Sequence, residues 1–417
     1  MICDLEIMNI LLVGSGAREH ALARALKRSR HDPNLIAYCA HANPGILELA
    51  QAYAIGSLTD VAAVVDFAVS QKADWAIIGP EAPLEAGVVD ALVGVGIPAV
   101  GPTKALAQIE TSNGFARDLL SAHNIMACPM YRRFTSAVGV EDYLLELNGA
   151  YVIKADGLMS GKGVKVSGEH IYSIDEAINW CRKIIAQNMP FVIEEKLIGQ
   201  EFSLMSFSDG EHLAHMSAVQ DHKRAFDGDT GSNTGGMGSY SSADHSLPFL
   251  NAEDIEQAQA KNASTVKALE TETGEMYKGI LYGGFMATRD GIKLIEYNAR
   301  FGDPESMNVL AILQSDFVDI CLAIIDGTLS ADQAQFAPKA TVCKYAVPEG
   351  YPDNPIKGQL LNVKGVINPD ILYFGSVIEQ NGALYELGSR ALAVVGVADT
   401  IPEAERMAED EINRIRG

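Results

Sequence analysis

The sequence predicts an α/β protein whose N-terminal part is a parallel sheet with helices on both faces. Two observations favour this class. Short apolar runs alternate with stretches of helical periodicity over the first 105 residues, and a glycine-rich turn joins the first run to the helix after it. Such a βαβ series has right-handed crossovers, which place the loops after the strands along one sheet edge. A ligand site is expected at that edge.

The expected elements follow in four regions. The first domain, residues 1–105, has strands at 10–13, 35–39, 75–78 and 97–100 and helices at 19–27, 61–71 and 87–93. A small α+β unit, residues 111–195, has helices at 111–120, 141–147 and 175–186 and strands at 151–154, 164–166 and 191–195. The third region, residues 196–335, has a long polar loop at 220–242 and strands at 281–287 and 292–297. The last region, residues 336–417, ends in a helix at 403–416.

Composition and charge exclude several classes of protein. A hydrophobic share of 48% and a charged share of 21% are typical of a soluble globular protein and not of a disordered one. The formal charge of −22 would repel a nucleic-acid backbone, so nucleic acid is not an expected partner. No apolar run reaches the roughly 18 to 20 residues needed to cross a bilayer, so no membrane association is expected.

The cysteines and the N-terminal segment indicate a cytoplasmic protein. The six cysteines show neither a CxxC pair nor a short Cys/His spacing, so neither a zinc site nor a disulfide framework is expected. Asp4 and Glu6 stand where a secretory signal would carry positive charge. Because a strand begins directly after Met8, translation from Met8 is an alternative to translation from Met1.

The first motif is the turn that contains Gly14, Ser15 and Gly16, followed by Arg18 and Glu19 at the start of a helix. Small residues let backbone N–H groups approach an anion, and the helix dipole attracts phosphate. The guanidinium of Arg18 suits a terminal phosphate through a forked contact. The turn therefore predicts a phosphate site, with a tight turn and a surface arginine as the alternative.

The same turn does not fit a dinucleotide. An NAD-binding fold would have a glycine at position 19 and an acid near position 40 for the ribose. The sequence has Glu19 and reads AHAN at residues 40–43. A nucleotide-dependent oxidoreductase is thus a disfavoured alternative.

The second motif, GPEAPL at residues 79–84, ends another strand of the same sheet. Its two prolines, Pro80 and Pro83, are expected to fix a rigid loop that presents Glu81 at the edge where the first turn lies. The two segments can share one ligand. A rigid turn with a solvated Glu81 is the alternative.

The third motif, KADGLMSGKGV at residues 154–164, places Lys154 at a strand end before Gly161, Lys162 and Gly163. Cations and free backbone donors of this kind suit a lid over a polyphosphate, although the segment is not a Walker A sequence. A flexible surface hairpin is the alternative.

The next strand ends in Glu194 and Glu195, and Lys196, Leu197 and Glu201 follow it. A transition from strand to linker offers backbone groups for adenine, and the acid a few residues on suits the ribose hydroxyls. The two segments together predict a nucleotide held between two lobes.

The remaining motifs come from the third region. Residues 220–240, rich in charged side chains and glycines, are expected to form a loop that a ligand or neighbouring residues must order. In the segment EYNARFGDPE, the alternation of a strand places Glu296, Asn298 and Arg300 on one side. Two oxygen ligands suited to Mg²⁺ and a cation beside them are what phosphoryl transfer needs, and a surface salt-bridge cluster is the alternative.

Taken in this order, the motifs resemble the glycinamide ribonucleotide synthetase family, also called the phosphoribosylamine-glycine ligases, of the ATP-grasp superfamily. The matching stretches include GSGAREHAL from Gly14, GPEAPLEAG from Gly79, GPTKALAQIE from Gly101, KADGLMSGKGV from Lys154 and the two motifs of the third region. The resemblance implies an N-terminal substrate-binding α/β domain, a two-lobed ATP-grasp domain and a small α+β C-terminal domain. It also implies a ligase that joins glycine to 5-phosphoribosylamine with ATP and Mg²⁺ or Mn²⁺, through a glycyl phosphate, in de novo purine synthesis.

The resemblance also implies a role for each motif residue. ATP would contact Lys154, Gly161, Lys162, Gly163, Glu194, Glu195, Lys196, Leu197 and Glu201. The substrates would contact Gly14, Ser15, Gly16, Arg18, Glu19, Glu81, Pro83, Asp221 and Lys223. Arg300, Asp221 and Lys154 would be catalytic, and Glu296 and Asn298 would hold the metal. The partners would be small molecules only, and the chain is expected to be a monomer.

Two positions depart from the family pattern. Asn113 stands where the family usually has a lysine that reaches ATP phosphate, and residues 282–286 offer no acid for the metal. Arg117, one helical turn after Asn113, can replace the missing charge. The open alternative is a nucleotide-binding homologue that has lost turnover.

Overall fold

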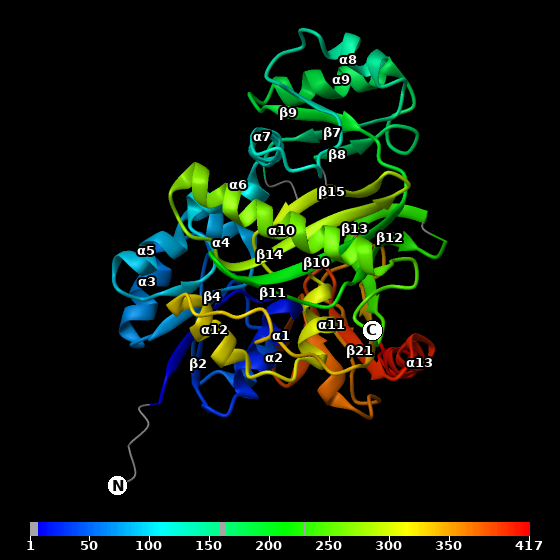
Figure 1. The fold of residues 1–417 in the computed structure, drawn as a ribbon. Helices are drawn as coiled ribbons and strands as arrows, with labels where there is room; N and C mark the ends of the chain where they lie inside the picture. Colours follow the sequence, from blue (N-terminus) through cyan, green and yellow to red (C-terminus); the bar gives the residue numbers. More distant parts are fainter. Residues whose placement is uncertain (1–6, 158–162, 229) are drawn as a thin grey trace.

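The computed structural model describes residues 7–157, 163–228 and 230–417. An N-terminal domain, a small lobe, a central sheet and a C-terminal sheet pack around one another, and the small lobe stands apart at the top of Figure 1. Among the described residues, we find no helix whose length and apolar character would let it span a bilayer.

The N-terminal domain has the parallel sheet that the sequence predicts, with a fifth strand, Ala52–Ile55, that was not expected. Its strand order is β3-β2-β1-β4-β5, with every pair parallel. The strands are β1 (Asn9–Val13), β2 (Asn34–Cys39), β3 (Ala52–Ile55), β4 (Trp75–Ile78) and β5 (Ala99–Val100). The helices are α1 (Ala17–Lys27), α2 (Pro44–Leu49), α3 (Val61–Ser70), α4 (Glu81–Ala86), α5 (Val88–Gly94) and α6 (Lys104–Thr111). The strand order reverses at β1, so the ends of β1 and β4 form the switch point where ligands bind in such sheets.

Two of the expected segments have a different structure. The segment predicted as a rigid loop at residues 79–84 is helical from Glu81 onward, because a proline such as Pro83 is tolerated in the first turn of a helix. The helix predicted at residues 111–120 is two helices, α6 and α7 (Asn113–Ala122). Ser112 separates them and caps α7 by accepting a hydrogen bond from the backbone N–H of Phe115.

The small lobe is a four-stranded antiparallel sheet in the order β6-β9-β7-β8. Its elements are β6 (Tyr131–Phe134), α8 (Val140–Glu146), β7 (Tyr151–Ala155), β8 (Val164–Val166), α9 (Ile174–Ile185) and β9 (Phe191–Glu195). Phe134, Tyr143 and Phe191 fill its own hydrophobic core. The lobe therefore has a core separate from the rest of the molecule.

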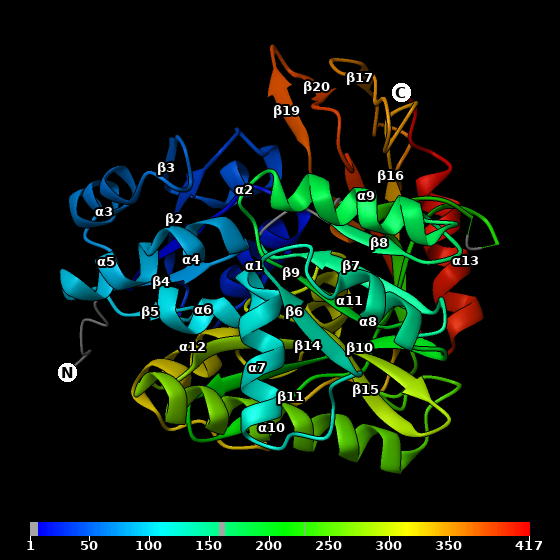
Figure 2. The ribbon, with the colours of Figure 1, turned by 90° about the horizontal axis from the view of Figure 1, so that it is seen from above.

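The central sheet has the order β11-β10-β14-β15. Its strands are β10 (Gln200–Asp209), β11 (Leu213–His215), β14 (Lys278–Thr288) and β15 (Gly291–Asn298). The long helix α10 (Ala252–Thr273) packs on this sheet, and α11 (Glu305–Ile312) and α12 (Phe317–Asp326) follow β15 (Figure 2). β15 lies beside α6 and α7, which brings the end of β15 close to the N-terminal domain.

The polar segment at residues 220–242 is not a loop, and that expectation was wrong. It forms the antiparallel strands β12 (Gln220–Phe226) and β13 (Thr230–Ser241). The pairing tolerates this composition because its register shifts twice and because the glycines of β13 allow close approach. A Cβ on Gly238 would lie 2.6 Å from the carbonyl oxygen of Cys343 in the next strand.

This hairpin belongs to a sheet that it shares with the C-terminal part, in the order β12-β13-β16-β21-β18. The remaining elements are β16 (Ala340–Ala346), β17 (Leu360–Leu361), η1 (Pro369–Ile371), β18 (Leu372–Phe374), β19 (Val377–Gln380), β20 (Ala383–Glu386), β21 (Leu392–Ala398) and α13 (Ile401–Ile412). The hairpin is thus anchored to the C-terminal sheet.

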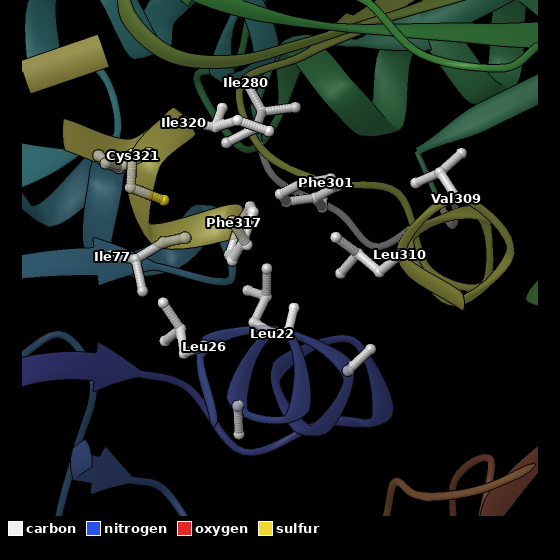
Figure 3. Close-up of a cluster of buried hydrophobic side chains, with 14 of the residues drawn as sticks. Leu22, Leu26, Ile77, Ile280, Phe301, Val309, Leu310, Phe317, Ile320 and Cys321 are labelled. Carbon is white, nitrogen blue, oxygen red and sulfur yellow. The ribbon is translucent and has the colours of Figure 1, made fainter. Parts of the chain in front are cut away.

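A shared hydrophobic core joins the N-terminal domain to the central part. Figure 3 shows Leu22 and Leu26 of α1 facing Phe301 and Phe317. All four are fully or almost fully buried, and burying a side chain of this size contributes about 1.5 to 3 kcal/mol. This core fixes the distance between the β1–α1 turn and the segment after β15.

Candidate functional site

The two N-terminal motifs meet through the side chain of Glu19. Its Oε2 accepts a hydrogen bond from the backbone N–H of Gly16 at 2.5 Å. A Cβ on Gly14 would lie 2.4 Å from Glu19 Cγ, and a Cβ on Gly79 would lie 2.3 Å from Glu19 Oε1. Glycine at both positions therefore makes room for a buried glutamate, which explains why position 19 is not the glycine of a dinucleotide fold.

Ser15 and Pro83 contribute to the scaffold of the same edge. The Ser15 hydroxyl accepts a hydrogen bond from the backbone N–H of Ala40 at 2.6 Å, which ties the end of β2 to the turn after β1. Pro83 is buried within α4. Ser15 is buried as well.

Arg18 connects this edge to the segment after β15. Its Nε lies 2.6 Å from Glu19 Oε1, and its Nη1 donates to the carbonyl oxygen of Phe301 at 3.1 Å. The side chain is 9% exposed. An arginine carries five N–H donors, so within the described part of the chain these two contacts leave donors free on a fixed, largely desolvated guanidinium.

Arg300 is the centre of the charge cluster. Its Nε lies 3.3 Å from Glu81 Oε2, its Nη2 lies 2.9 Å from Glu110 Oε1, and its Nη1 donates to the Phe301 carbonyl oxygen at 3.1 Å. Its Nη2 also donates to Asn298 Oδ1 at 3.3 Å. Among the described residues, these four contacts leave one of its five N–H donors, on Nη1, without a partner.

Lys154 lies in a second cluster, between the small lobe and β15. Its Nζ lies 2.5 Å from Glu194 Oε1 and donates to the carbonyl oxygen of Ile295 at 2.7 Å. Arg117 Nε donates to the other carboxylate oxygen of Glu194 at 2.8 Å. Burial would raise the pKa of Glu194, but Arg117 and Lys154 outweigh burial and lower it. Glu194 is therefore the anionic centre of a buried triad.

The neighbouring residues of the strand end have other partners. Glu195 Oε1 accepts a hydrogen bond from the backbone N–H of Met130 at 2.9 Å, and Lys196 Nζ lies 2.8 Å from Glu169 Oε1. Leu197 is half-buried, and Gly163 directly precedes β8. Gly161 and Lys162 lie outside the described residues.

A third group combines Glu201, Lys223 and Glu296. Lys223 Nζ lies 2.5 Å from Glu201 Oε1 and 3.8 Å from Glu296 Oε1. Burial would raise the pKa of Glu296, but Lys223, Lys154 and Arg300 outweigh burial and lower it. The carboxylate of Glu296 and the amide oxygen of Asn298 are hard oxygen ligands, and an anionic carboxylate at the end of β15 fits a divalent cation.

Asp221 lies in an unusual environment for a carboxylate. Its Oδ1 is buried and has no hydrogen-bond partner among the described residues, and a Cβ on Gly236 would lie 2.6 Å from it. Burial and the neighbouring Glu305 carboxylate raise the pKa of Asp221 well above its ordinary value. Burial also raises the pKa of Glu305, whose Oε1 accepts a hydrogen bond from the Tyr282 hydroxyl at 2.8 Å. An acid pair of this kind favours a cationic ligand beside it.

Three charged residues of the site were not predicted from the sequence. Glu110 lies in the stretch GPTKALAQIE, among the buried positions Leu106, Ala107 and Ile109, and a charge on a buried helix face was the signal that could have found it. Glu305 completes the segment after β15. Arg390, from the C-terminal domain, donates to the carbonyl oxygens of Gly235 at 2.6 Å and Asp303 at 2.9 Å, and no local pattern predicts that contact.

The departure at position 113 has a structural counterpart. Asn113 Nδ2 donates to the carbonyl oxygen of Ala155 at 3.1 Å, so the side chain ties α7 to the end of β7. Gly114 fits there because an added Cβ would lie 2.6 Å from Arg133 Nε. Arg117 is 3% exposed and already bound to Glu194. Asn113 therefore carries no charge to this end of β7, and the charge of Arg117 is paired with Glu194.

One cluster of three potential metal ligands lies elsewhere in the described ranges, formed by His31, Asp316 and Asp319. Asp316 Oδ2 accepts hydrogen bonds from the Ser29 hydroxyl and the backbone N–H of Arg30. Asp319 pairs with Arg30 and His31. These carboxylates already have protein partners, unlike Asp221 Oδ1.

Comparison with known families matches the chain along most of its length. Models for phosphoribosylglycinamide synthetase match as the N domain over residues 8–110, the ATP-grasp (A) domain over residues 111–306 and the C domain over residues 341–417.

Curated relatives and a solved structure agree with these matches. Phosphoribosylamine-glycine ligase of Methanocella arvoryzae is 47% identical over 411 residues, covering 98% of this chain and 94% of the relative. The enzyme of the same name from Methanocaldococcus jannaschii is 50% identical over 421 residues, with the same coverage. The crystal structure of phosphoribosylamine-glycine ligase from Thermotoga maritima has a TM-score of 0.83 at 27% identity, covering 98% of this chain and 97% of that one. On its fold, its site and these relatives, the chain belongs to the phosphoribosylglycinamide synthetase family.

Proposed function

We propose that this chain joins glycine to 5-phosphoribosylamine at the expense of ATP, giving glycinamide ribonucleotide, ADP and phosphate. The observation that carries the proposal is the contact of Arg300, at the end of β15, with Glu81 of the N-terminal domain. A domain suited to a ribose phosphate thereby adjoins a strand suited to metal and phosphoryl groups. Relatives at 47% to 50% identity carry the name of this activity.

The reaction proceeds in two steps in this proposal. A carboxylate oxygen of glycine attacks the γ-phosphorus of ATP, the bond from that phosphorus to the bridging oxygen breaks, and ADP leaves. The amine nitrogen of phosphoribosylamine then attacks the carbonyl carbon of glycyl phosphate. The new C–N bond forms, the C–O bond to phosphate breaks, and the amine loses a proton. Formation of the acyl phosphate supplies the leaving group that a free carboxylate lacks.

On the nucleotide side, Lys154 uses two of its three N–H donors on Glu194 and Ile295. No other described residue takes the third, which is offered to a phosphate oxygen in the proposal. Gly163 and the neighbouring Gly161 and Lys162 complete this phosphate contact in the proposal. The strand end from Glu194 to Leu197 contacts adenine through its backbone, because the Glu194 carboxylate is already committed. Glu201, held by Lys223, takes the ribose hydroxyls.

For the metal, Glu296 and Asn298 would be the protein ligands, and Mg²⁺ or Mn²⁺ is the ion that such oxygen ligands suit. When bound, the ion neutralises phosphate charge. Arg300 offers its free Nη1 N–H to the migrating phosphoryl group or to the acyl phosphate. Its neighbours Glu81 and Glu110 hold the guanidinium in place while that charge develops.

On the substrate side, the backbone from Gly14 to Gly16, Arg18 and the α4 turn with Glu81 and Pro83 would bind the ribose phosphate. Glycine carries an ammonium group, which the unpartnered Asp221 Oδ1 can accept. Lys223 lies near the same carboxylates and would face the carboxylate of glycine. These assignments give each ionic group of the substrates a partner of opposite charge.

The expected setting is a monomer in the cytoplasm. The cysteines among the described residues are free thiols, as in a reducing compartment. Light scattering of the purified chain tests the monomeric state.

An ADP-release assay tests the function. Glycine and phosphoribosylamine are omitted in turn, with and without Mg²⁺ or Mn²⁺ after chelation. The ligase requires glycine, phosphoribosylamine and a divalent ion for full turnover, with product confirmed by mass. Tight ATP binding without turnover would instead support a homologue that only binds nucleotide.

A further inference from the structure

We infer that Glu110 is a positioning residue that holds Arg300 in its working orientation and couples it to the N-terminal domain. The inference rests on the proposed function for the role of Arg300. Glu110 lies in the last turn of α6, the helix that leads from the N-terminal sheet to α7. Its side chain is 5% exposed, against 17% for Arg300.

Both oxygens of Glu110 bind the same short segment. Oε1 lies 2.9 Å from Arg300 Nη2, and Oε2 accepts a hydrogen bond from the backbone N–H of Ala299 at 2.7 Å. One carboxylate thus fixes the backbone just before Arg300 and the guanidinium of Arg300 together. A contact made to the side chain alone would leave the strand end free to shift.

Burying a carboxylate on a helix face is costly. Burial raises the pKa of Glu110 to about 7, although Arg300 opposes that rise. An apolar side chain would pack at this position without that desolvation cost. The desolvation of Glu110 is thus offset in part by its ion pair with Arg300, which orients the guanidinium.

Glu81 holds the same guanidinium from the N-terminal domain. Its Oε2 lies 3.3 Å from Arg300 Nε, and it belongs to the first turn of α4. Burial alone would raise the pKa of Glu81, but Arg300 and Arg18 outweigh burial and hold it at about 2. Two carboxylates that precede α7 in the chain, one from α4 and one from α6, therefore set the position of an arginine at the end of β15. Helices α4 and α6 are thus linked to Arg300 directly through these two carboxylates.

The first test measures turnover. Glu110→Gln should lower kcat about 10- to 100-fold, because a misplaced catalytic group loses rate on that scale. The KM for ATP should change less than about threefold, since the nucleotide contacts are elsewhere. Glu110→Asp keeps the charge on a shorter side chain, so its kcat should lie between those of the wild type and Glu110→Gln. Glu85→Gln, an exposed acid on α4, is the matched control and should behave as wild type.

A double-mutant cycle separates positioning from general damage. If Glu110 acts through Arg300, Glu110→Gln should lower kcat much less in the Arg300→Lys background than in the wild-type background. Fully additive losses would overturn the inference, as would wild-type kcat in Glu110→Gln. If Glu110→Gln does not fold, Glu110→Asp is the variant to measure. A wild-type kcat in Glu110→Asp would then overturn the inference.

A readout that does not need turnover keeps this inference distinct from the proposed function. The Nη2–H signal of Arg300 in ¹⁵N NMR, assigned with Arg300→Lys, should be protected from solvent exchange in the wild type and in Glu85→Gln, because Glu110 Oε1 holds Nη2. It should exchange faster in Glu110→Gln. An unchanged exchange rate would contradict the inference even if ligation is confirmed, and faster exchange would support it even if ligation is not.

Discussion

The Nζ of Lys154 lies 2.5 Å from Oε1 of Glu194, and the side chains of both residues are about 95% buried. The other oxygen of Glu194 accepts from Arg117 at 2.8 Å. One carboxylate therefore holds two cations at the junction of the small lobe and β15. Burial lowers the pKa of Lys154 while Glu194 raises it, so the charge of the lysine depends on its partner.

Replacing Lys154 with glutamine should weaken ATP binding, because the third N–H donor of the ammonium is the proposed phosphate contact. A charged hydrogen bond of this kind contributes about 1.5 to 3 kcal/mol, or roughly 10- to 150-fold in Kd. Calorimetry with ATP measures the change. An unchanged Kd in a folded variant would remove Lys154 from the nucleotide site.

Replacing Glu194 with glutamine should destabilise the fold more than it affects chemistry. Lys154 and Arg117 would then be buried without an anion, and breaking a buried pair costs about 3 to 5 kcal/mol. Urea unfolding compares this variant with Glu141→Gln, an exposed acid in the first turn of α8, which should be neutral. A loss below about 1 kcal/mol, the range of an exposed pair, would contradict the buried triad.

The stability of the protein should depend on pH through Glu110. Its pKa rises from an ordinary 4.5 to about 7 on folding, so the folded state binds a proton that the unfolded state has released between these values. Stability from this group is therefore greatest below pH 4.5 and is lost as the pH rises to 7, on the order of 3 kcal/mol in all.

The comparison of wild type with Glu110→Gln isolates this contribution. Urea unfolding between pH 5 and 7.5 should show the wild type losing stability relative to the variant as the pH rises. Glu81 does not interfere, because its lowered pKa places its own loss of stability below pH 4.5. A difference that stays constant over this range would show that Glu110 keeps an ordinary pKa.

Replacing Arg18 with alanine should raise the KM for phosphoribosylamine and leave the KM for ATP nearly unchanged. Arg18 belongs to the N-terminal domain and contacts Glu19 and Phe301, away from the Lys154 cluster. Steady-state kinetics with each substrate varied in turn give both constants. The reverse pattern would place Arg18 at the nucleotide.

The sequence predicted the parallel N-terminal sheet and strands β14 and β15, because these strands contain apolar runs whose side chains are largely buried in the folded protein. It did not predict the β12–β13 hairpin, since the pairing depends on β16, about 100 residues later in the chain. Glu110 and Arg390 were missed for the same reason. Their partners, Arg300 and Gly235, are distant in the chain, and only the tertiary fold brings them together.

Position 113 shows the limit of reading a role from a motif. A lysine was missing and Arg117 was the expected substitute, yet Arg117 is committed to Glu194 and to the carbonyl oxygen of Ile295. The spacing of charges along a helix indicates which side chains could extend to a ligand, but not which of them already pair with another protein group.

If the reaction passes through glycyl phosphate, a carboxylate oxygen of glycine becomes part of the released phosphate. Glycine labelled with ¹⁸O in its carboxylate, incubated with ATP, phosphoribosylamine and Mg²⁺, tests this by mass analysis of the phosphate. The account predicts one ¹⁸O atom in each phosphate released with formation of glycinamide ribonucleotide. Phosphate without the label, alongside ADP release, would contradict it.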